Sequence, residues 1–143
     1  FFQTAFGTAE LAALAHTALA QQPSANGIPT RRLGRTNEQV SILCLGGGHI
    51  GEMERKDATR VMHAAIDEGI TFFDNAWEYG DGYAEEVMGE ALAVGDKRQD
   101  VFLMTKDCER DYDGSLRNLE DSLRRLKTDY IDLFFSPIFF FPT

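Results

Sequence analysis

Three residues whose side chains can transfer or tune a proton lie at or just after the ends of two apolar runs. Asp74 and Lys106 each follow such a run, and Tyr79 comes five positions after Asp74. A tyrosine hydroxyl titrates at about 10, which makes it a weak acid at neutral pH. A nearby ammonium strengthens that acid, and a carboxylate keeps the ammonium charged and oriented. Together the three side chains would form a tuned general acid.

The elements that must position these residues follow a repeating order. Apolar runs predict four strands, over residues 41–45, 70–73, 101–105 and 131–135. Apolar residues at helical spacing predict three helices between them, over residues 57–68, 84–94 and 115–126. A small hairpin is expected before them, turning at Gly34. Successive strands begin about 30 residues apart, which is the usual length of a strand–helix–strand unit.

This alternation predicts a parallel sheet covered by helices. An open doubly wound sheet and a closed barrel both satisfy it. In a barrel the chemistry lies at the carboxyl ends of the strands, where Asp74 and Lys106 would converge. Asp57 is expected to cap the first helix, Gly69 to end it, and Ser115 to lie near the cap of the third.

The loop after the first strand is rich in glycine. It matches the G-x-G-x-x-G pattern of dinucleotide-binding folds through Gly46, Gly48 and Gly51. Asp74 lies near the position of the ribose-binding acid in such folds, so a Rossmann-type dehydrogenase is one alternative. Glu52 and Glu54 argue against it, because they put carboxylates where phosphates would bind. A glycine loop that lets a flat ligand approach the backbone is the favoured interpretation, with His49 as a candidate substrate contact.

Composition excludes several classes of function. The 143 residues carry a net charge of -9, and basic residues are scattered, which argues against a nucleic-acid partner. Cys44 and Cys108 lie in no metal-binding pattern, so no metal is expected and both thiols are predicted to be buried or half-buried. His63, in the middle of a helix, is interpreted as structural.

The first 22 residues differ in composition from the rest. They are rich in Ala and Leu and end near a small-x-small pattern, Ala18-Leu19-Ala20, which is typical of a signal peptide. They resemble the later part of a bacterial twin-arginine export signal. Export to the periplasm is expected if they act so, and a cytoplasmic location otherwise. An amphipathic N-terminal helix is the alternative, and no membrane span is expected. Residues 23–30 are interpreted as a linker and 31–143 as the domain.

Four blocks of the sequence carry a resemblance to a known family. They are RRLGRTNEQVSILCLGGG, GITFFDNAWEYGDGYAEEVMGEAL, VFLMTK and SLRNLEDSLRRLKTDYIDL. In order and spacing, from 31 to 133, they resemble the aldo-keto reductases. The resemblance implies a (β/α)₈ TIM barrel, of which this chain holds roughly the first four βα units. It also implies reduction of a small-molecule aldehyde or ketone, with NADP(H) expected rather than NAD(H).

The same resemblance implies roles for individual residues. Asp74, Tyr79 and Lys106 match three members of a catalytic tetrad, in which Tyr79 protonates the carbonyl oxygen. The residues expected near the nicotinamide are Gly46, Gly47, Gly48 and Asp74. Trp77 is expected to form a wall of the substrate pocket, with His49 beside it.

The chain departs from the family at the fourth strand. The tetrad histidine would stand where the sequence has Pro137, and residues 136–143 (SPIFFFPT) are an unusual continuation. A fragment of a longer reductase is therefore expected, inactive on its own. The alternative is a non-catalytic binding or redox-sensing subunit of the same fold. The oligomeric state is left open.

Overall fold

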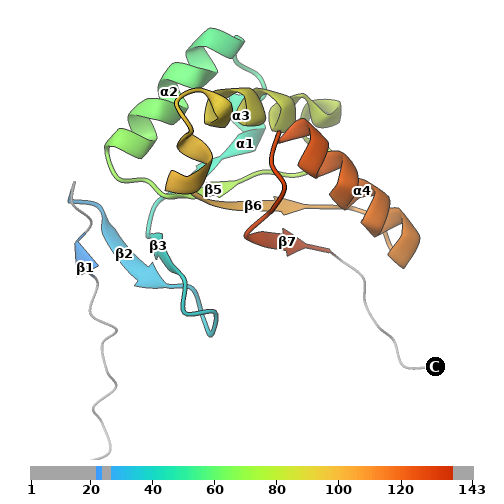
Figure 1. Ribbon diagram of the computed structural model, residues 1–143, viewed down its shortest axis with the longest axis horizontal. Helices are drawn as coiled ribbons and strands as arrows, with labels where there is room; N and C mark the ends of the chain where they lie inside the picture. Colours follow the sequence, from blue (N-terminus) through green and yellow to red (C-terminus); the bar gives the residue numbers. More distant parts are fainter. Residues whose placement is uncertain (1–21, 24–26, 137–143) are drawn as a thin grey trace, which may run out of the picture.

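The computed structural model describes residues 22–23 and 27–136 (Figure 1). Its strands are β1 (Gln22–Pro23), β2 (Pro29–Arg32), β3 (Gln39–Ser41), β4 (Cys44–Gly46), β5 (Phe72–Asp74), β6 (Phe102–Lys106) and β7 (Leu133–Phe135). Its helices are α1 (Gly47–Ile50), α2 (Arg55–Asp67), α3 (Tyr83–Ala93) and α4 (Tyr112–Arg125), with 3-10 turns η1 (Tyr79–Gly82) and η2 (Lys97–Asp100). The signal-like segment lies almost wholly outside the described residues, as do Pro137 and the rest of the tail.

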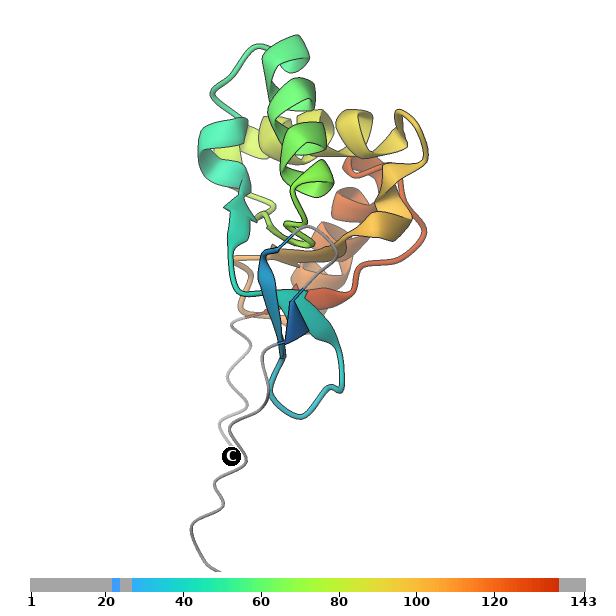
Figure 2. The same ribbon diagram turned by 90° about the vertical axis from the view of Figure 1, so that its left-hand side faces the viewer.

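A parallel sheet of four strands forms the body of the molecule, in the order β4-β5-β6-β7. The strands follow one another in chain order, and the helices lie on the same side of the sheet (Figures 1 and 2). A doubly wound sheet would reverse its strand order and carry helices on both faces. The sheet is therefore an arc of a (β/α)₈ barrel. Its four parallel strands form part of the barrel wall, and the helices between them lie outside that wall.

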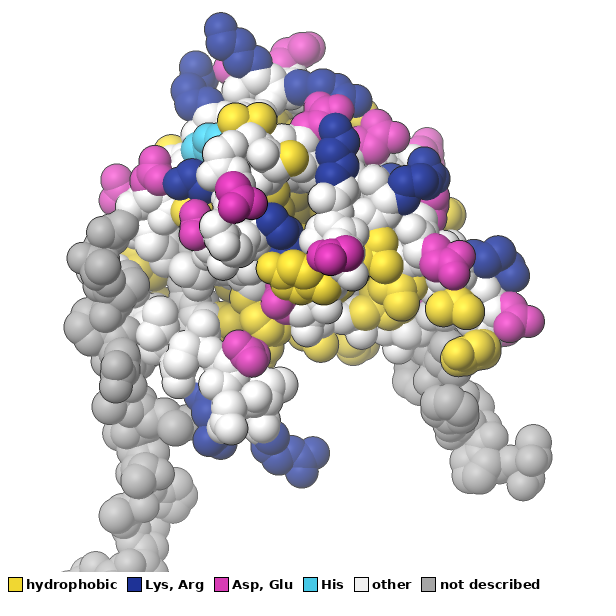
Figure 3. All heavy atoms as spheres, viewed as in Figure 1, with side chains coloured by type: hydrophobic (Ala, Val, Ile, Leu, Met, Phe, Trp, Pro, Cys, Tyr) yellow, Lys and Arg dark blue, Asp and Glu magenta, His cyan; other side chains and the backbone are white. Residues whose placement is uncertain are grey.

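The core lies between this arc and its helices. Phe73 and Leu103 point into it from adjacent strands and are fully buried. They pack against apolar side chains of α2 and α3, among them Met62, Val87, Met88 and Leu92. Because side chains alternate along a strand, Phe72 and Met104 belong to the opposite face and are only half-buried. Figure 3 shows charges of both signs interspersed over the helices and hydrophobic side chains gathered over the sheet below them.

A three-stranded antiparallel sheet, β1-β2-β3, precedes the arc. Its β2–β3 hairpin, with Arg31 opposite Val40, confirms the predicted hairpin. Gly34 has φ +54° within the turn, and β1 pairs with the start of β2.

The predicted strand over 41–45 is wrong in its extent. Ser41 closes β3, and the parallel strand begins only at Cys44. The cause is the Ser41 side chain: its hydroxyl accepts hydrogen bonds from the backbone N–H groups of Thr71 and Phe72, distant in sequence, and donates to the Leu43 carbonyl. The chain bends at this point, and Ile42 and Leu43 are exposed.

The predicted cap of α2 is wrong, whereas Ser115 lies near the cap of α4 as expected. α2 has Glu54 at its N-cap, so Asp57 lies in the first turn and pairs with Arg60. The helix dipole still stabilises a carboxylate at this position. α4 has Asp111 at its N-cap, which accepts the Gly114 N–H at 2.8 Å. The prediction that Gly69 ends the first helix is confirmed by its position after the C-cap and its φ of +91°.

The thiols differ from their prediction: Cys44 and Cys108 are both exposed. Cys44 belongs to the sheet face turned away from the helices, and Cys108 lies in the loop after β6. His63 is structural as interpreted, with Nε2 2.8 Å from the Ala91 carbonyl oxygen. Within residues 22–23 and 27–136, no helix is both long and apolar enough to cross a membrane.

Candidate active site

The carboxyl ends of three parallel strands bring the predicted residues to one edge of the sheet. Gly46, Asp74 and Lys106 are the last residues of β4, β5 and β6. Gly46 is in register with Asp74, and Asp74 with Met104 on the next strand. Convergence at this edge was expected from the strand ends alone, and the structure brings the side chains into contact.

The Lys106 ammonium is held by two acceptors. It donates to Asp74 Oδ1 in an ion pair and to the backbone carbonyl of Asn75 at 2.7 Å. The two side chains keep 24% and 35% of their surface exposed, so solvent still reaches this edge. Asn75 is completely buried and donates its amide to the Met88 sulfur.

Tyr79 stands beside this pair at the start of η1. The Lys106 Nζ atom is 5.2 Å from the centroid of the Tyr79 ring. The loop that carries Tyr79 is attached to β6, because the backbone N–H of Trp77 donates to the Lys106 carbonyl at 2.8 Å. The three residues of the predicted acid therefore form one cluster.

A pocket of about 460 Å³ opens beside the cluster. It is lined by Gly46, Gly48, His49, Glu52, Asp74, Tyr79 and Gly80. His49 lies at the mouth, 99% exposed, with Nδ1 3.7 Å from Glu52 Oε2.

The loop glycines differ in how much space surrounds them, and close packing requires a glycine at position 47. A Cβ on Gly47 would lie 2.6 Å from Asn75 Cγ, so a side chain there would displace the residue that holds Lys106. A Cβ on Gly48 would lie 3.8 Å from the Tyr79 ring, an ordinary van der Waals contact. Gly46 has open space where a side chain would be, and it faces the pocket. The loop enters α1 directly, which the sequence pattern did not predict.

Trp77 lies elsewhere. Its indole N–H donates to Asp121 of α4 at 3.1 Å, and the Arg125 guanidinium lies over its ring at 5.1 Å. It is not one of the described residues that line the pocket.

Sequence reasoning missed three residues that support the site: Asn75, Glu85 and Arg125. Glu85 is completely buried, accepts the Thr105 hydroxyl at 2.7 Å and faces Arg125 at 3.5 Å. Burial raises the pKa of the Glu85 carboxyl. A charged residue in the otherwise apolar stripe of a helix would have been the signal for Glu85, and Asn75 could have been noted for its place next to Asp74.

Cys44 lies near the site on the inner sheet face. The residue as a whole is exposed, but neighbouring protein atoms keep water from part of its thiol; this desolvation, and then the Asp74 carboxylate, raise the pKa of the thiol from 9.0 to about 11. This thiol is therefore a poor nucleophile at neutral pH.

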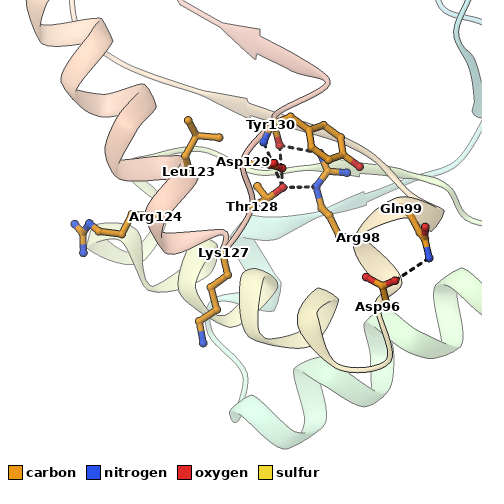
Figure 4. Close-up of a pocket in the computed structure, with 9 residues that line it drawn as sticks. All are labelled: Asp96, Arg98, Gln99, Leu123, Arg124, Lys127, Thr128, Asp129 and Tyr130. Atoms are coloured by element: carbon orange, nitrogen blue, oxygen red, sulfur yellow. Dashed lines mark hydrogen bonds between the residues drawn. The ribbon is translucent and has the colours of Figure 1, made fainter.

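A larger hollow, of about 650 Å³, lies at the opposite ends of the strands (Figure 4). Arg98 occupies it and donates to Thr128, the Val101 and Tyr130 carbonyls and Asp132. Its guanidinium also stacks on the Tyr130 ring at 3.9 Å. These contacts fix the start of β6 to the loop before β7, so this end of the barrel has a structural role.

The sequence and the structure are similar to those of known proteins. The family model described as the aldo/keto reductase family matches residues 42–143. The uncharacterized oxidoreductase YrpG of Bacillus subtilis is 41% identical over 122 residues, covering 71% of this chain and 37% of the relative. Methylglyoxal reductase YeaE of Escherichia coli is 41% identical over 101 residues, covering 66% and 35%.

Two solved structures share the fold. The thermostable aldo-keto reductase Tm1743, solved with the inhibitor epalrestat, superimposes with a TM-score of 0.67 at 34% identity, over 73% of this chain and 41% of that one. An aldo-keto reductase of Klebsiella pneumoniae solved with NADPH has a TM-score of 0.62 at 36% identity, over 68% and 35%.

The arc of parallel strands, with a lysine, an aspartate and a tyrosine at its carboxyl edge, defines part of a (β/α)₈ barrel. The chain belongs to the aldo/keto reductase family. It spans a little over a third of the length of the relatives it matches.

Proposed function

We propose that this chain supplies the proton-donating part of a carbonyl-reducing site that works with NADP(H). The observation that carries the proposal is the cluster itself. Lys106, held by Asp74 and the Asn75 carbonyl, lies 5.2 Å from the Tyr79 ring at the edge of a pocket. A relative named as a methylglyoxal reductase and a structural neighbour solved with NADPH support the reaction class and the cofactor.

The residues divide the proton chemistry among them. Tyr79 donates its hydroxyl proton to the carbonyl oxygen of an aldehyde or ketone. The Lys106 ammonium stabilises the phenolate that remains, and Asp74 keeps this ammonium charged and directed toward the tyrosine. Uptake of one proton from solvent then restores Tyr79, and the product is an alcohol.

The glycine loop fits the nicotinamide end of the cofactor. Gly46 has no neighbour where a side chain would stand, and with Gly48 and Asp74 it lines the pocket beside Tyr79. A flat ring can lie against such a backbone. Gly47, by contrast, packs on Asn75. Its role would be to let Asn75 lie against the loop backbone. When bound, NADP(H) supplies the hydride that adds to the carbonyl carbon.

Two predicted pocket residues enter this proposal differently. His49 lines the pocket and would contact the substrate at its mouth. Trp77 is directed at Asp121, so we assign it to the support of the loop. We further propose that residues 31–143 act as part of a longer protein whose other strands close the barrel.

The decisive experiment is Tyr79→Phe in the gene product that carries this chain. We expect kcat for reduction of 4-nitrobenzaldehyde by NADPH to fall by about 10² or more, because the general acid is lost. Tyr112→Phe is the matched control, since Tyr112 is 70% exposed on α4, and it should keep the wild-type rate. Equal rates for wild type and Tyr79→Phe would remove Tyr79 from the mechanism, and a wild type without activity would favour the non-catalytic, redox-sensing alternative.

We also propose that residues 1–22 direct export of the protein. The support is their composition and the Ala18-Leu19-Ala20 pattern. The domain would then work outside the cytoplasm.

A further inference from the structure

Arg125, near the end of α4, lies in a polar cluster beneath the loop that carries Tyr79. Its side chain is only 14% exposed. Nη2 lies 2.6 Å from Asp121 Oδ2, and Nη1 lies 3.5 Å from Glu85 Oε2. Two carboxylates from two helices thus fix the guanidinium in one orientation.

The position of Arg125 depends on how closely α3 and α4 approach. A Cβ on Gly89 would lie 2.4 Å from the Arg125 carbonyl oxygen and 2.6 Å from Leu126 Cα. The absence of a side chain at this point lets the two helices touch. Glu85, one turn earlier on α3, is then completely buried against Thr105 and faces the guanidinium.

The guanidinium contacts the catalytic loop at both of its ends. At the beginning, Nη1 donates to the Trp77 carbonyl at 3.0 Å, and the group lies over the indole ring. At the end, Gly82 has φ +93°, and a Cβ there would lie 2.3 Å from Arg125 Cζ. Tyr79 stands between these two contacts, while Arg125 itself does not line the described pocket.

We propose that Arg125 is a positioning residue, which clamps the loop 77–82 so that Tyr79 stays beside Lys106. The inference rests on the proposed role of Tyr79 as proton donor. Asp121 takes part because it binds both the guanidinium and the Trp77 indole. Glu85 takes part by holding the other side of Arg125. A planar, multiply donating group is needed to reach all these acceptors at once, which a lysine cannot do.

The first test reads the loop without using activity. Trp77 is the single tryptophan of the 143 residues, so its fluorescence reports on the clamp in the gene product that carries this chain, with any tryptophan outside these residues replaced by phenylalanine. In Arg125→Met we expect acrylamide to quench it about twice as strongly, because the buried charged contact that holds the indole is gone. Arg117→Met, an exposed arginine on the same helix, should leave quenching unchanged.

The second test measures kinetics in the gene product that carries the chain. Arg125→Met should lower kcat for 4-nitrobenzaldehyde by about 10², since small misplacement of a reacting group is that costly. The KM for NADPH should stay within about twofold, because the clamp does not contact the pocket. Arg117→Met should have wild-type values. In a variant that merely loosens the fold, total activity would fall in proportion to the amount of folded protein, and the kcat per folded molecule would not change.

Glu85→Gln provides a second variant should Arg125→Met fail to fold. It keeps the shape and the Thr105 contact but removes the charge facing Arg125. Quenching should therefore rise and kcat should fall, each by less than in Arg125→Met. Unchanged quenching in both variants would overturn the clamp. Increased quenching with unchanged kcat would overturn its role in positioning Tyr79. An inactive wild type would remove the proposed function, while the quenching comparison would still decide whether Arg125 holds the loop.

Discussion

Asn75 illustrates how a single residue at this site serves several neighbours. Its backbone carbonyl accepts a hydrogen bond from Lys106, and its side-chain oxygen accepts one from the Ala76 N–H at 2.9 Å. Its buried side chain also leaves no room for anything larger than glycine at position 47. The electrostatic partner of Lys106 is Asp74, but the direction of the ammonium depends equally on this neighbour.

At the scale of single residues, Cys44 also allows a prediction of how the alkylation rate of its thiol depends on pH. Its pKa is raised from 9.0 to about 11, and only the thiolate is alkylated. The thiolate fraction at pH 8 is therefore about 10⁻³, and it grows about tenfold for each pH unit until the pKa is reached. In Cys108→Ser, iodoacetamide labelling of Cys44, followed by mass spectrometry, should accelerate in this way.

Glutathione in the same buffers is the reference for that labelling experiment. Its labelling rate should level off at a lower pH than that of Cys44, since its thiol is fully hydrated. A Cys44 rate that already levels off below pH 9 would contradict the raised pKa.

At the scale of elements, α4 has an unexpected buried face. The buried positions of this helix include Gly114, Ser115, Asn118 and Ser122, whereas Leu116 is exposed. Small and polar side chains suit this face, because α3 comes so close at Gly89 and because it adjoins Glu85. Leu126, directly after the last residue of α4, is fully buried.

The close approach of α3 and α4 predicts a cost for any side chain at Gly89. Gly89→Ala would place its Cβ 2.4 Å from the Arg125 carbonyl oxygen. Backbone on both sides must then shift, so we expect the free energy of unfolding to fall by about 1 to 3 kcal/mol. Chemical denaturation followed by circular dichroism would measure it.

Gly114→Ala is the matched control for that prediction. Gly114 is also helical, and its nearest neighbour is the flexible Glu109 side chain at 3.0 Å. Alanine favours a helix over glycine by about 0.5 to 1 kcal/mol, so this variant should be at least as stable as wild type. Equal losses in the two variants would show that Gly89 has no special role in packing.

At the scale of the whole molecule, the sheet is open. Within residues 22–23 and 27–136, β4 and β7 each pair on one side only, and the sheet face away from the helices carries Phe72, Phe102 and Met104 half-buried. Parallel sheets are ordinarily covered on both faces. In a closed barrel this inner face is filled by side chains from the other strands, which agrees with a chain that spans about a third of its relatives' length.

Export is the prediction that concerns the protein as a whole. If residues 1–22 act as a signal, the mature protein recovered from cells should begin at Gln21, directly after Ala18-Leu19-Ala20. N-terminal sequencing of the native protein, from fractionated cells, would measure this. A cytoplasmic protein that retains residues 1–20 would contradict it.

The sequence by itself determined the order of the main strands and helices and which strand ends lie at the same edge of the sheet. Apolar runs predicted the four parallel strands, because local periodicity sets which residues are buried. Asp74 and Lys106 meet because the carboxyl ends of parallel strands lie at the same edge of a sheet. The sequence also placed Tyr79 in the loop after β5. The bend at Ser41 and the N-cap of α4 escaped it, since each depends on side-chain hydrogen bonds that no local pattern marks.

Only the tertiary structure decided between a barrel and a doubly wound sheet. The same alternation of strands and helices is compatible with both, and the choice lies in strand order and in the side on which the helices pack. The tertiary structure alone also brought Glu85, Asp121 and Arg125 together from α3 and α4 under the Tyr79 loop. Contacts between helices distant in the chain leave no local periodicity, so the support of this site became visible only in three dimensions.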